Sequence, residues 1–395
     1  MKTSISAVRA GAACPAHTRR GKLDAAFRGV KPLAPLLLLL SACLTPPRVA
    51  PVQEAGEWPM TMGGPLRAGY ADESVPVAVE VAWREGVGRG IAAPLLLAGD
   101  VLLATTTSRG LVSMNAETGG KYWDRRFSGA FAGSAVRRGR IAFVATRDRE
   151  QRTFAIDLER GRRVWSRRIG AARAEPVLAG QRVIVATEAR EVVALDAAGG
   201  EVVWRTRLGA AAAVAPVPFD DDVFVVTTAD SVYRLDGANG RITARGSLPA
   251  TPAAPLVLRR DTLIAALHSG EVAALHVEEM KVAWTATVDA PILAPPAVAD
   301  DGAVYVLTRD ASVWRISGAR DVRRIAALGG AATGAFTLAR GGLLVGRLDG
   351  TLFLLDLEGN IIWQMDLGDS IVAPVSVYGG AVYVPLLHGD IVKLQ

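Results

Sequence analysis

Tryptophan recurs along this chain at a nearly constant spacing, and this period constrains the fold more than any other feature. Successive markers lie 40, 42, 39, 80 and 79 positions apart, at Trp83, Trp123, Trp165, Trp204, Trp284 and Trp363. The two long gaps are double periods, and their midpoints, Ala244 and Arg324, mark copies in which the Trp is replaced. The sequence therefore holds eight copies of a unit of about 40 residues, a length typical of one β-propeller blade.

The third copy shows most clearly that each unit predicts four short strands. These strands are expected at residues 175–180, 182–187, 192–196 and 201–207. Asp196 closes the third of them, where its carboxylate can hydrogen-bond the turn backbone, and the glycines that follow permit a positive φ. The Trp falls on the fourth, outermost strand, where its large ring can pack between neighbouring blades. We therefore assign the six tryptophans to blade docking rather than to ligand stacking.

The last copy offers only three strands, between Ala373 and Leu394. A matching fourth strand stands at the other end of the repeat region, in residues 79–85, and contains Trp83. We expect this N-terminal strand to complete the last blade, which removes an exposed sheet edge. The predicted fold is all-β: a single eight-bladed propeller of four-stranded antiparallel blades over residues 75–395.

The N-terminal region reads as an export signal. Residues 30–43, VKPLAPLLLLLSAC, contain an apolar stretch that is too short to span a bilayer but fits a secretory signal. The stretch ends in LSAC, which resembles a bacterial lipobox, so Cys43 is expected to be the lipidated residue. We predict a lipoprotein signal peptide at 1–43, with a true start near residue 30, and a flexible tether and lead-in segment at 44–74. Leu44, rather than Asp, favours the outer membrane.

Charge and cysteine usage narrow the function of the mature part. Seven of the 45 basic residues and one of the 39 acidic residues lie in the first 43 positions, which leaves 38 of each sign. A neutral domain gives no reason to expect nucleic-acid binding, because the basic excess lies in the segment expected to be removed. No Cys follows Cys43, so neither a disulfide nor a thiolate ligand set is available to the propeller.

The repeat landmarks A-P, D-G, A-L-D, T-G and W resemble the pyrroloquinoline-quinone-like (PQQ-like) propeller repeat over roughly residues 58–395. With a lipobox and no other domain, the chain most resembles the BamB family of outer-membrane protein assembly lipoproteins. This resemblance implies a lipid-anchored scaffold facing the periplasm, a single propeller that binds the β-barrel assembly subunit or another envelope protein. The family's main contact loops correspond to the short Ala-, Gly- and Pro-rich connections 208–215 and 248–254, so no contact residue is carried over.

Two other function classes stay open. Quinone-dependent dehydrogenases of similar repeat need an acidic and amide cluster for Ca²⁺ and usually a cysteine pair. Here the Asp residues occupy turn positions, and the three His residues of the repeats, His268, His276 and His388, also fall at turns. We therefore expect no catalytic, cofactor-binding or metal-binding residue and no enzyme activity. The second alternative is a propeller that binds a ligand or polysaccharide of the envelope.

One copy is unusually rich in arginine. Residues 134–168 contain eleven Arg and four acidic residues, in a domain that is otherwise neutral. The surface of this copy is either a solvated, salt-bridged face or a surface for an acidic partner. The run RDREQR reads as the loop between the second and third strands, so the candidate partner-binding residues are Arg147, Arg149 and Arg152.

Overall fold

Short apolar runs separated by Gly- and Asp-containing turns form the strands that the repeat predicts. The chain divides into units 1–45 and 46–395, and the computed structural model describes residues 70–395 of the second. Within these residues every regular element is a strand. Cys43 lies outside the described residues. No helix in the described part is long and apolar enough to cross a membrane.

The strands group into eight sheets, numbered here as blades 1 to 8 in chain order. Blades 1 to 4 contain β3 (Leu96–Ala98), β4 (Val101–Thr105), β5 (Gly110–Asn115), β6 (Lys121–Arg126); β7 (Val136–Arg138), β8 (Ile141–Ala145), β9 (Arg152–Asp157), β10 (Arg163–Arg168); β11 (Val177–Ala179), β12 (Arg182–Ala186), β13 (Glu191–Asp196), β14 (Val202–Arg207); and β15 (Val217–Phe219), β16 (Asp222–Val226), β17 (Ser231–Leu235), β18 (Ile242–Ser247). Blades 5 to 8 contain β19 (Val257–Arg259), β20 (Thr262–Ala266), β21 (Glu271–His276), β22 (Lys281–Thr287); β23 (Ala297–Val298), β24 (Val304–Leu307), β25 (Ser312–Gly318), β26 (Asp321–Ala327); β27 (Phe336–Arg340), β28 (Gly342–Gly346), β29 (Thr351–Leu355), β30 (Ile361–Asp366); and β31 (Ser376–Tyr378), β32 (Ala381–Pro385), β33 (Asp390–Leu394) with β2 (Val81–Gly86).

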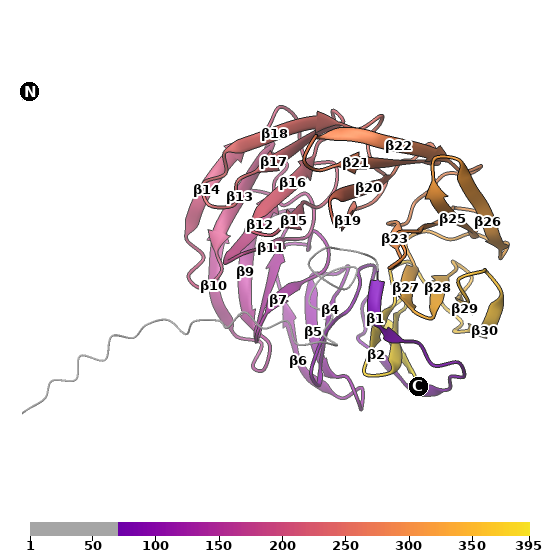
Figure 1. The fold of residues 1–395 in the computed structure, drawn as a ribbon. Coiled ribbons are helices and arrows are strands. Elements are labelled where there is room, and N and C mark those ends of the chain that lie inside the picture. Colours follow the sequence, from indigo (N-terminus) through magenta and orange to yellow (C-terminus); the bar gives the residue numbers. More distant parts are fainter. Residues whose placement is uncertain (1–69) are drawn as a thin grey trace, which may run out of the picture. The chain divides into compact units, whose positions relative to one another are not determined.

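The eight blades follow one another around a ring (Figure 1). Within each blade the repeat strands pair antiparallel in chain order. Toward the centre of the ring, the first strands of blades 2 to 7 contact one another in order, and those of blades 8 and 1 contact each other. The middle strands are buried on both faces, which is why they read as continuous apolar runs; all five residues of β8 are buried. The prediction of an all-β, eight-bladed propeller is confirmed.

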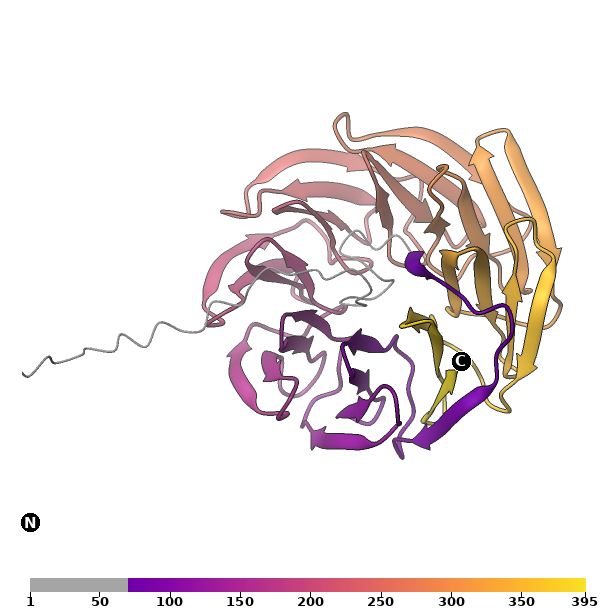
Figure 2. The ribbon, with the colours of Figure 1, turned by 60° about the horizontal axis from the view of Figure 1, so that its bottom comes forward.

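Blade 8 is built from both ends of the repeat region, as the sequence predicts (Figure 2). Strand β2 pairs antiparallel with β33, with Trp83 opposite Lys393. The closing blade is then tied to blade 1: Lys393 is 2% exposed and its Nζ lies 2.6 Å from Glu117 Oε2, and the Tyr383 hydroxyl donates to Ala116 O. One apolar core runs through blades 7, 8 and 1, so the join is packed as well as hydrogen-bonded.

A further strand joins the ring ahead of β2. Strand β1 (Tyr70–Ser74) pairs in parallel with β27, the first strand of blade 7, and also contacts β31 of blade 8. The Glu73 carboxylate accepts a hydrogen bond from Gly380 N–H of blade 8. Strand β1 lies within the segment 44–74 that was expected to be tether and lead-in. Its sequence, YADES, has no apolar alternation by which a strand could have been recognised.

In each fourth strand that carries a Trp, a β-bulge lies directly before the Trp. In β14, for example, Ala194 pairs with Trp204 and Leu195 with Val202, so Val203 is the extra residue. The same shift occurs before the Trp of β2, β6, β10, β22 and β30. A bulge bends and twists the strand, and here it accompanies an indole that contacts the next blade.

Candidate partner-binding surface

The tryptophans lie between blades, on the outer strands where the repeat places them. The indole Nε1 of Trp123 donates to Leu158 O of blade 2 at 2.8 Å, and that of Trp204 donates to Gly237 O of blade 4, also at 2.8 Å. Equivalent bonds from Trp83, Trp165 and Trp363 reach Ala116, Ala197 and Pro76. These indoles bridge neighbouring blades through a ring that is buried in Trp204 and half-buried in the other four, and through one satisfied N–H, which is a structural task.

The loop with the candidate arginines connects β8 to β9 in blade 2. The hydroxyl of Thr146 accepts a hydrogen bond from Arg152 N–H, and Gln151 has a positive φ of 50°, which turns the chain into β9. Arg147 and Arg149 are exposed on this loop. Arg152 is instead the first residue of β9; it is half-buried, and its Nη1 lies 3.3 Å from Ser166 Oγ. The loop therefore ends at Gln151, one residue earlier than the run RDREQR predicts.

Arg147 borders a hollow of about 220 Å³ between blades 1 and 2, together with Thr106 and Phe131. A larger groove of about 480 Å³ lies between the outer strands of the same two blades. Between them stands an aromatic cluster in which the Phe127 ring centroid is 5.1 Å from Phe131 and 5.0 Å from Phe154. The two cavities are thus separate features of one blade junction.

Four arginines border the larger groove, and none of them is among the predicted partner-binding residues. Arg125 and Arg126 end β6 of blade 1, whereas Arg163 begins the outer strand of blade 2 and Arg162 directly precedes it. The first pair falls outside the Arg-rich copy 134–168. Its signal was the doubled Arg that follows Trp123, but the sequence alone does not place it opposite the second pair.

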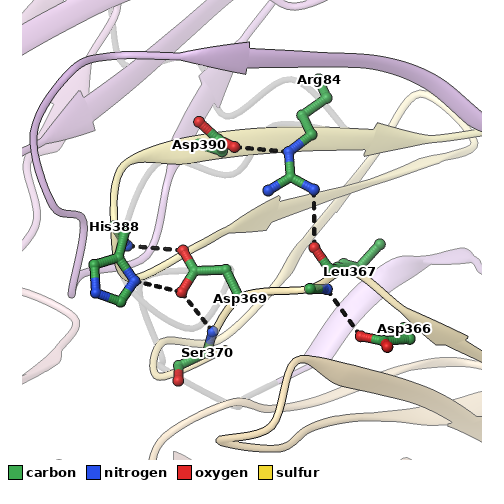
Figure 3. A network of polar contacts seen from close by, with 8 residues as sticks. Arg84, Asp366, Leu367, Asp369, Ser370, His388 and Asp390 are labelled. Carbon is green, nitrogen blue, oxygen red and sulfur yellow. Dashed lines mark hydrogen bonds and ion pairs between the residues drawn. The ribbon is translucent and has the colours of Figure 1, made fainter.

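A polar network joins blades 7 and 8 (Figure 3). The ring Nδ1 and the backbone N of His388 lie 2.6 and 2.9 Å from the Asp369 carboxylate, and Arg84 bridges Asp390 and Leu367 O. Burial alone would raise the pKa of Asp369, but hydrogen bonds from His388 and Ser370 N–H outweigh it and lower the pKa. The Ser370 hydroxyl donates to Leu348 O, so this hydroxyl is not aligned as a nucleophile with the His–Asp pair.

Within residues 70–395 the donor groups of a calcium–quinone site do not come together. Across residues 70–395 no three His, Cys, Asp or Glu side chains gather closely enough to hold a metal ion. The turn carboxylates bind their own backbone instead: Asp196 accepts from Ala198 and Gly199 N–H, and Asp356 accepts from Glu358 and Asn360 N–H. The residues present therefore do not fit the Ca²⁺-bound quinone that related folds carry.

The fold is similar to that of several solved structures. BamB from Moraxella catarrhalis has a TM-score of 0.66 at 16% identity, covering 80% of this chain and 100% of that chain. Quinohemoprotein alcohol dehydrogenase from Comamonas testosteroni has a TM-score of 0.69 at 13% identity, with 86% and 80% covered. A europium-containing methanol dehydrogenase has a TM-score of 0.70 at 10% identity, with 87% and 98% covered. Such identities show the fold alone.

Sequence comparison is more discriminating. No curated protein matches the chain. The family model described as outer membrane protein assembly factor BamB matches residues 77–174, 154–291 and 251–325, which together span more than half of the chain and most of the ring. The chain therefore belongs to the BamB family of PQQ-like β-propellers.

Proposed function

We propose that this protein is a non-catalytic, lipid-anchored scaffold on the periplasmic side of the outer membrane, where it assists the assembly of β-barrel proteins. The family match over residues 77–325 carries the proposal. Two features support it: the turn carboxylates are engaged by backbone N–H groups, and a closed ring presents rigidly held loops to a partner. The protein acts as a single propeller within a complex, with the barrel-forming subunit or another envelope protein as its partner.

The blade 2 loop is the proposed contact for this partner. Arg147 and Arg149 are exposed, and Arg152 follows at the start of β9. Among the described residues, neither Arg147 nor Arg149 has a side-chain hydrogen bond or ion pair, although Asp148 between them is engaged by Ala130 N–H. Arg pairs bidentately with carboxylates and buries its stem, so this loop suits an acidic partner.

Charge reversal tests this contact. The variant Arg147→Glu/Arg149→Glu/Arg152→Glu should lower crosslinked capture of the barrel-forming subunit from intact cells by on the order of tenfold, most strongly at low salt. The control variant Arg207→Glu/Arg241→Glu/Arg320→Glu changes the net charge equally at exposed positions on blades 3, 4 and 6. It should capture the subunit like the wild type. If the blade 2 variant does so too, the loop is not the contact; if the wild type captures no barrel-forming subunit, the scaffold proposal fails.

The anchor has a separate test. Cys43 is the proposed acyl acceptor, so Cys43→Ser should shift the protein from the membrane fraction to the soluble periplasmic fraction. Fractionation followed by immunoblotting measures the shift, and the Cys14→Ser variant should stay with the membrane. Retention of the Cys43→Ser protein in the membrane fraction would refute lipid anchoring.

A further inference from the structure

The groove between blades 1 and 2 lacks a bond that closes the next two Trp-bridged junctions, those between blades 2 and 3 and between blades 3 and 4. In β10 the residue two positions after the Trp, Arg167, donates from Nε to Gly200 O at 2.7 Å. In β14 the corresponding residue, Thr206, donates to Gly240 O at 2.5 Å. Both acceptors are positive-φ turn glycines of the next blade. In each case this bond closes the junction beside the indole.

Arg125 holds the same repeat position in blade 1 but makes no such bond. Its counterpart acceptor would be Gly161, the positive-φ glycine of the blade 2 turn, which lines the groove together with Arg125. Within residues 70–395 the Arg125 guanidinium has no hydrogen-bond or ion-pair partner, and it is exposed. The junction between blades 1 and 2 therefore lacks the bond that closes the two junctions after it, and the Arg125 guanidinium is available to a ligand.

The groove carries an excess of positive charge. Arg125, Arg126, Arg162 and Arg163 are all exposed, and none of their side chains has a partner in the described part of the chain. Four guanidinium groups around one recess repel each other, and a ligand with carboxylates relieves this repulsion through paired N–H···O bonds. Charge complementarity thus selects an anionic occupant.

Among the described residues that line the groove, Glu150 is acidic, and it adds a second requirement. Its Oε1 accepts a hydrogen bond from Ser128 N–H at 2.6 Å. Its Oε2 is buried and has no donor in the described part of the chain. An unsatisfied buried acceptor is costly, so a ligand donor that Oε2 can reach through a rotation of the Glu150 side chain is favoured. A peptide backbone brings N–H donors beside its acidic side chains, whereas the phosphodiester of a lipid headgroup brings only acceptors.

The floor of the groove is apolar. Phe154 and Ile156, both buried on β9, form it, and Phe127 lines it with an edge-on contact to Phe154. Aromatic rings in a partly closed recess favour an apolar or aromatic side chain over a hydrated headgroup. The site thus combines an apolar floor, a charged rim and an unmet hydrogen-bond acceptor.

We propose that this groove binds an acidic peptide segment of a partner protein, with carboxylates paired to the four arginines and an aromatic or aliphatic side chain on the Phe154–Ile156 floor. The groove is separate from the hollow beside Arg147, because the Phe127, Phe131 and Phe154 cluster stands between them. Peptide binding here does not depend on the barrel-forming subunit being the partner.

The repeat supplies a matched control for the test. The double variant Arg126→Glu/Arg162→Glu alters the groove. The control Arg207→Glu/Arg241→Glu changes the same repeat positions on blades 3 and 4, where both side chains are exposed. Fluorescence anisotropy on the full chain in detergent would use a short labelled peptide of Asp, Glu and Phe, its Asn/Gln analogue, and a peptide of Asp, Glu and Ser. Vesicles containing anionic phospholipid would be tested by co-sedimentation.

The Asp/Glu/Phe peptide should bind the wild type and the control alike and bind the groove variant at least tenfold more weakly. The uncharged and Phe-free peptides should bind at least tenfold more weakly to the wild type. Equal weakening by the two double variants would reduce the effect to net charge and overturn the proposal. The proposal is also overturned if no peptide binds the wild type. If, in addition, the vesicles bind the wild type but not the groove variant, the groove binds lipid instead.

Discussion

The junction between blades 3 and 4 and the junction between blades 4 and 5 fill the same space with different residues. At the first, Trp204 is 7% exposed, and a Cβ on Gly240 of the next blade would lie 2.5 Å from its ring. At the second, Ala244 replaces the Trp and Met280 replaces the glycine, with a positive φ of 53° and 5% exposure. The large side chain comes from the outer strand of the earlier blade at the first junction and from the turn of the later blade at the second. The junction therefore specifies a pair of residues with a shared volume rather than a Trp as such.

Removing a junction altogether should have the largest effect. Deletion of residues 75–88 eliminates β2 and Trp83, and it leaves β33 with an unpaired edge and Lys393 without its cross-strand neighbour. We expect aggregation or loss of cooperative unfolding in urea, as measured by circular dichroism. Deletion of residues 44–57 should leave the unfolding midpoint unchanged. Equal damage from the two deletions would contradict closure of the ring by β2.

Exchanging the residue pair tests the shared volume directly. Gly240→Met places a side chain against Trp204 in a left-handed backbone conformation, which should cost about 3 kcal/mol of unfolding free energy. Trp204→Ala should cost about 4 kcal/mol through the cavity that it leaves. The double variant reproduces the Ala244–Met280 pair, so it should lose at least ~1 kcal/mol less than the sum of the single losses. Additive losses in urea unfolding would show that the two positions are independent.

A polar contact between blades 7 and 8 should have the smallest effect. Because the pKa of Asp369 is lowered in the folded protein, its contribution to stability is present above the unfolded pKa, near 4, and is lost as pH falls through the folded value. His388 is exposed, so the contribution should stay below about 1 kcal/mol. Asp369→Asn should flatten the decline of the urea midpoint between pH 5 and pH 2. The exposed control Asp289→Asn should leave that decline unchanged, and an identical slope for both variants would contradict the prediction.

The sequence predicts the ring because the features that build it are local and repeated. The Trp period, the turn Asp and the three-strand final copy give eight blades and the closing strand. Strand β1 escaped prediction, since YADES pairs in parallel with a strand about 270 residues away and carries no period of its own. Two further features were not predicted: the replacement of the Trp–Gly pair by Ala244 and Met280, and the absence of a partner for Arg125 in the described part of the chain. Both depend on which side chain of one blade faces which turn of the next, and a single copy of the repeat does not reveal this.

The closing strand also has a consequence for how the protein is made. Glu80 and Gln395 exchange two backbone hydrogen bonds of 3.0 Å, and Arg84 pairs with Asp390 across a separation of 306 residues. During synthesis β2 leaves the ribosome before any other strand of blades 1 to 8, and its partner is translated after almost all of them. Such long-range pairing is slow. Until it occurs, the unpaired strand β2 and the free edge of β33 are accessible to proteases and chaperones. A chain truncated before β33 cannot pair β2, so its ring stays unclosed and its sheet edges stay exposed.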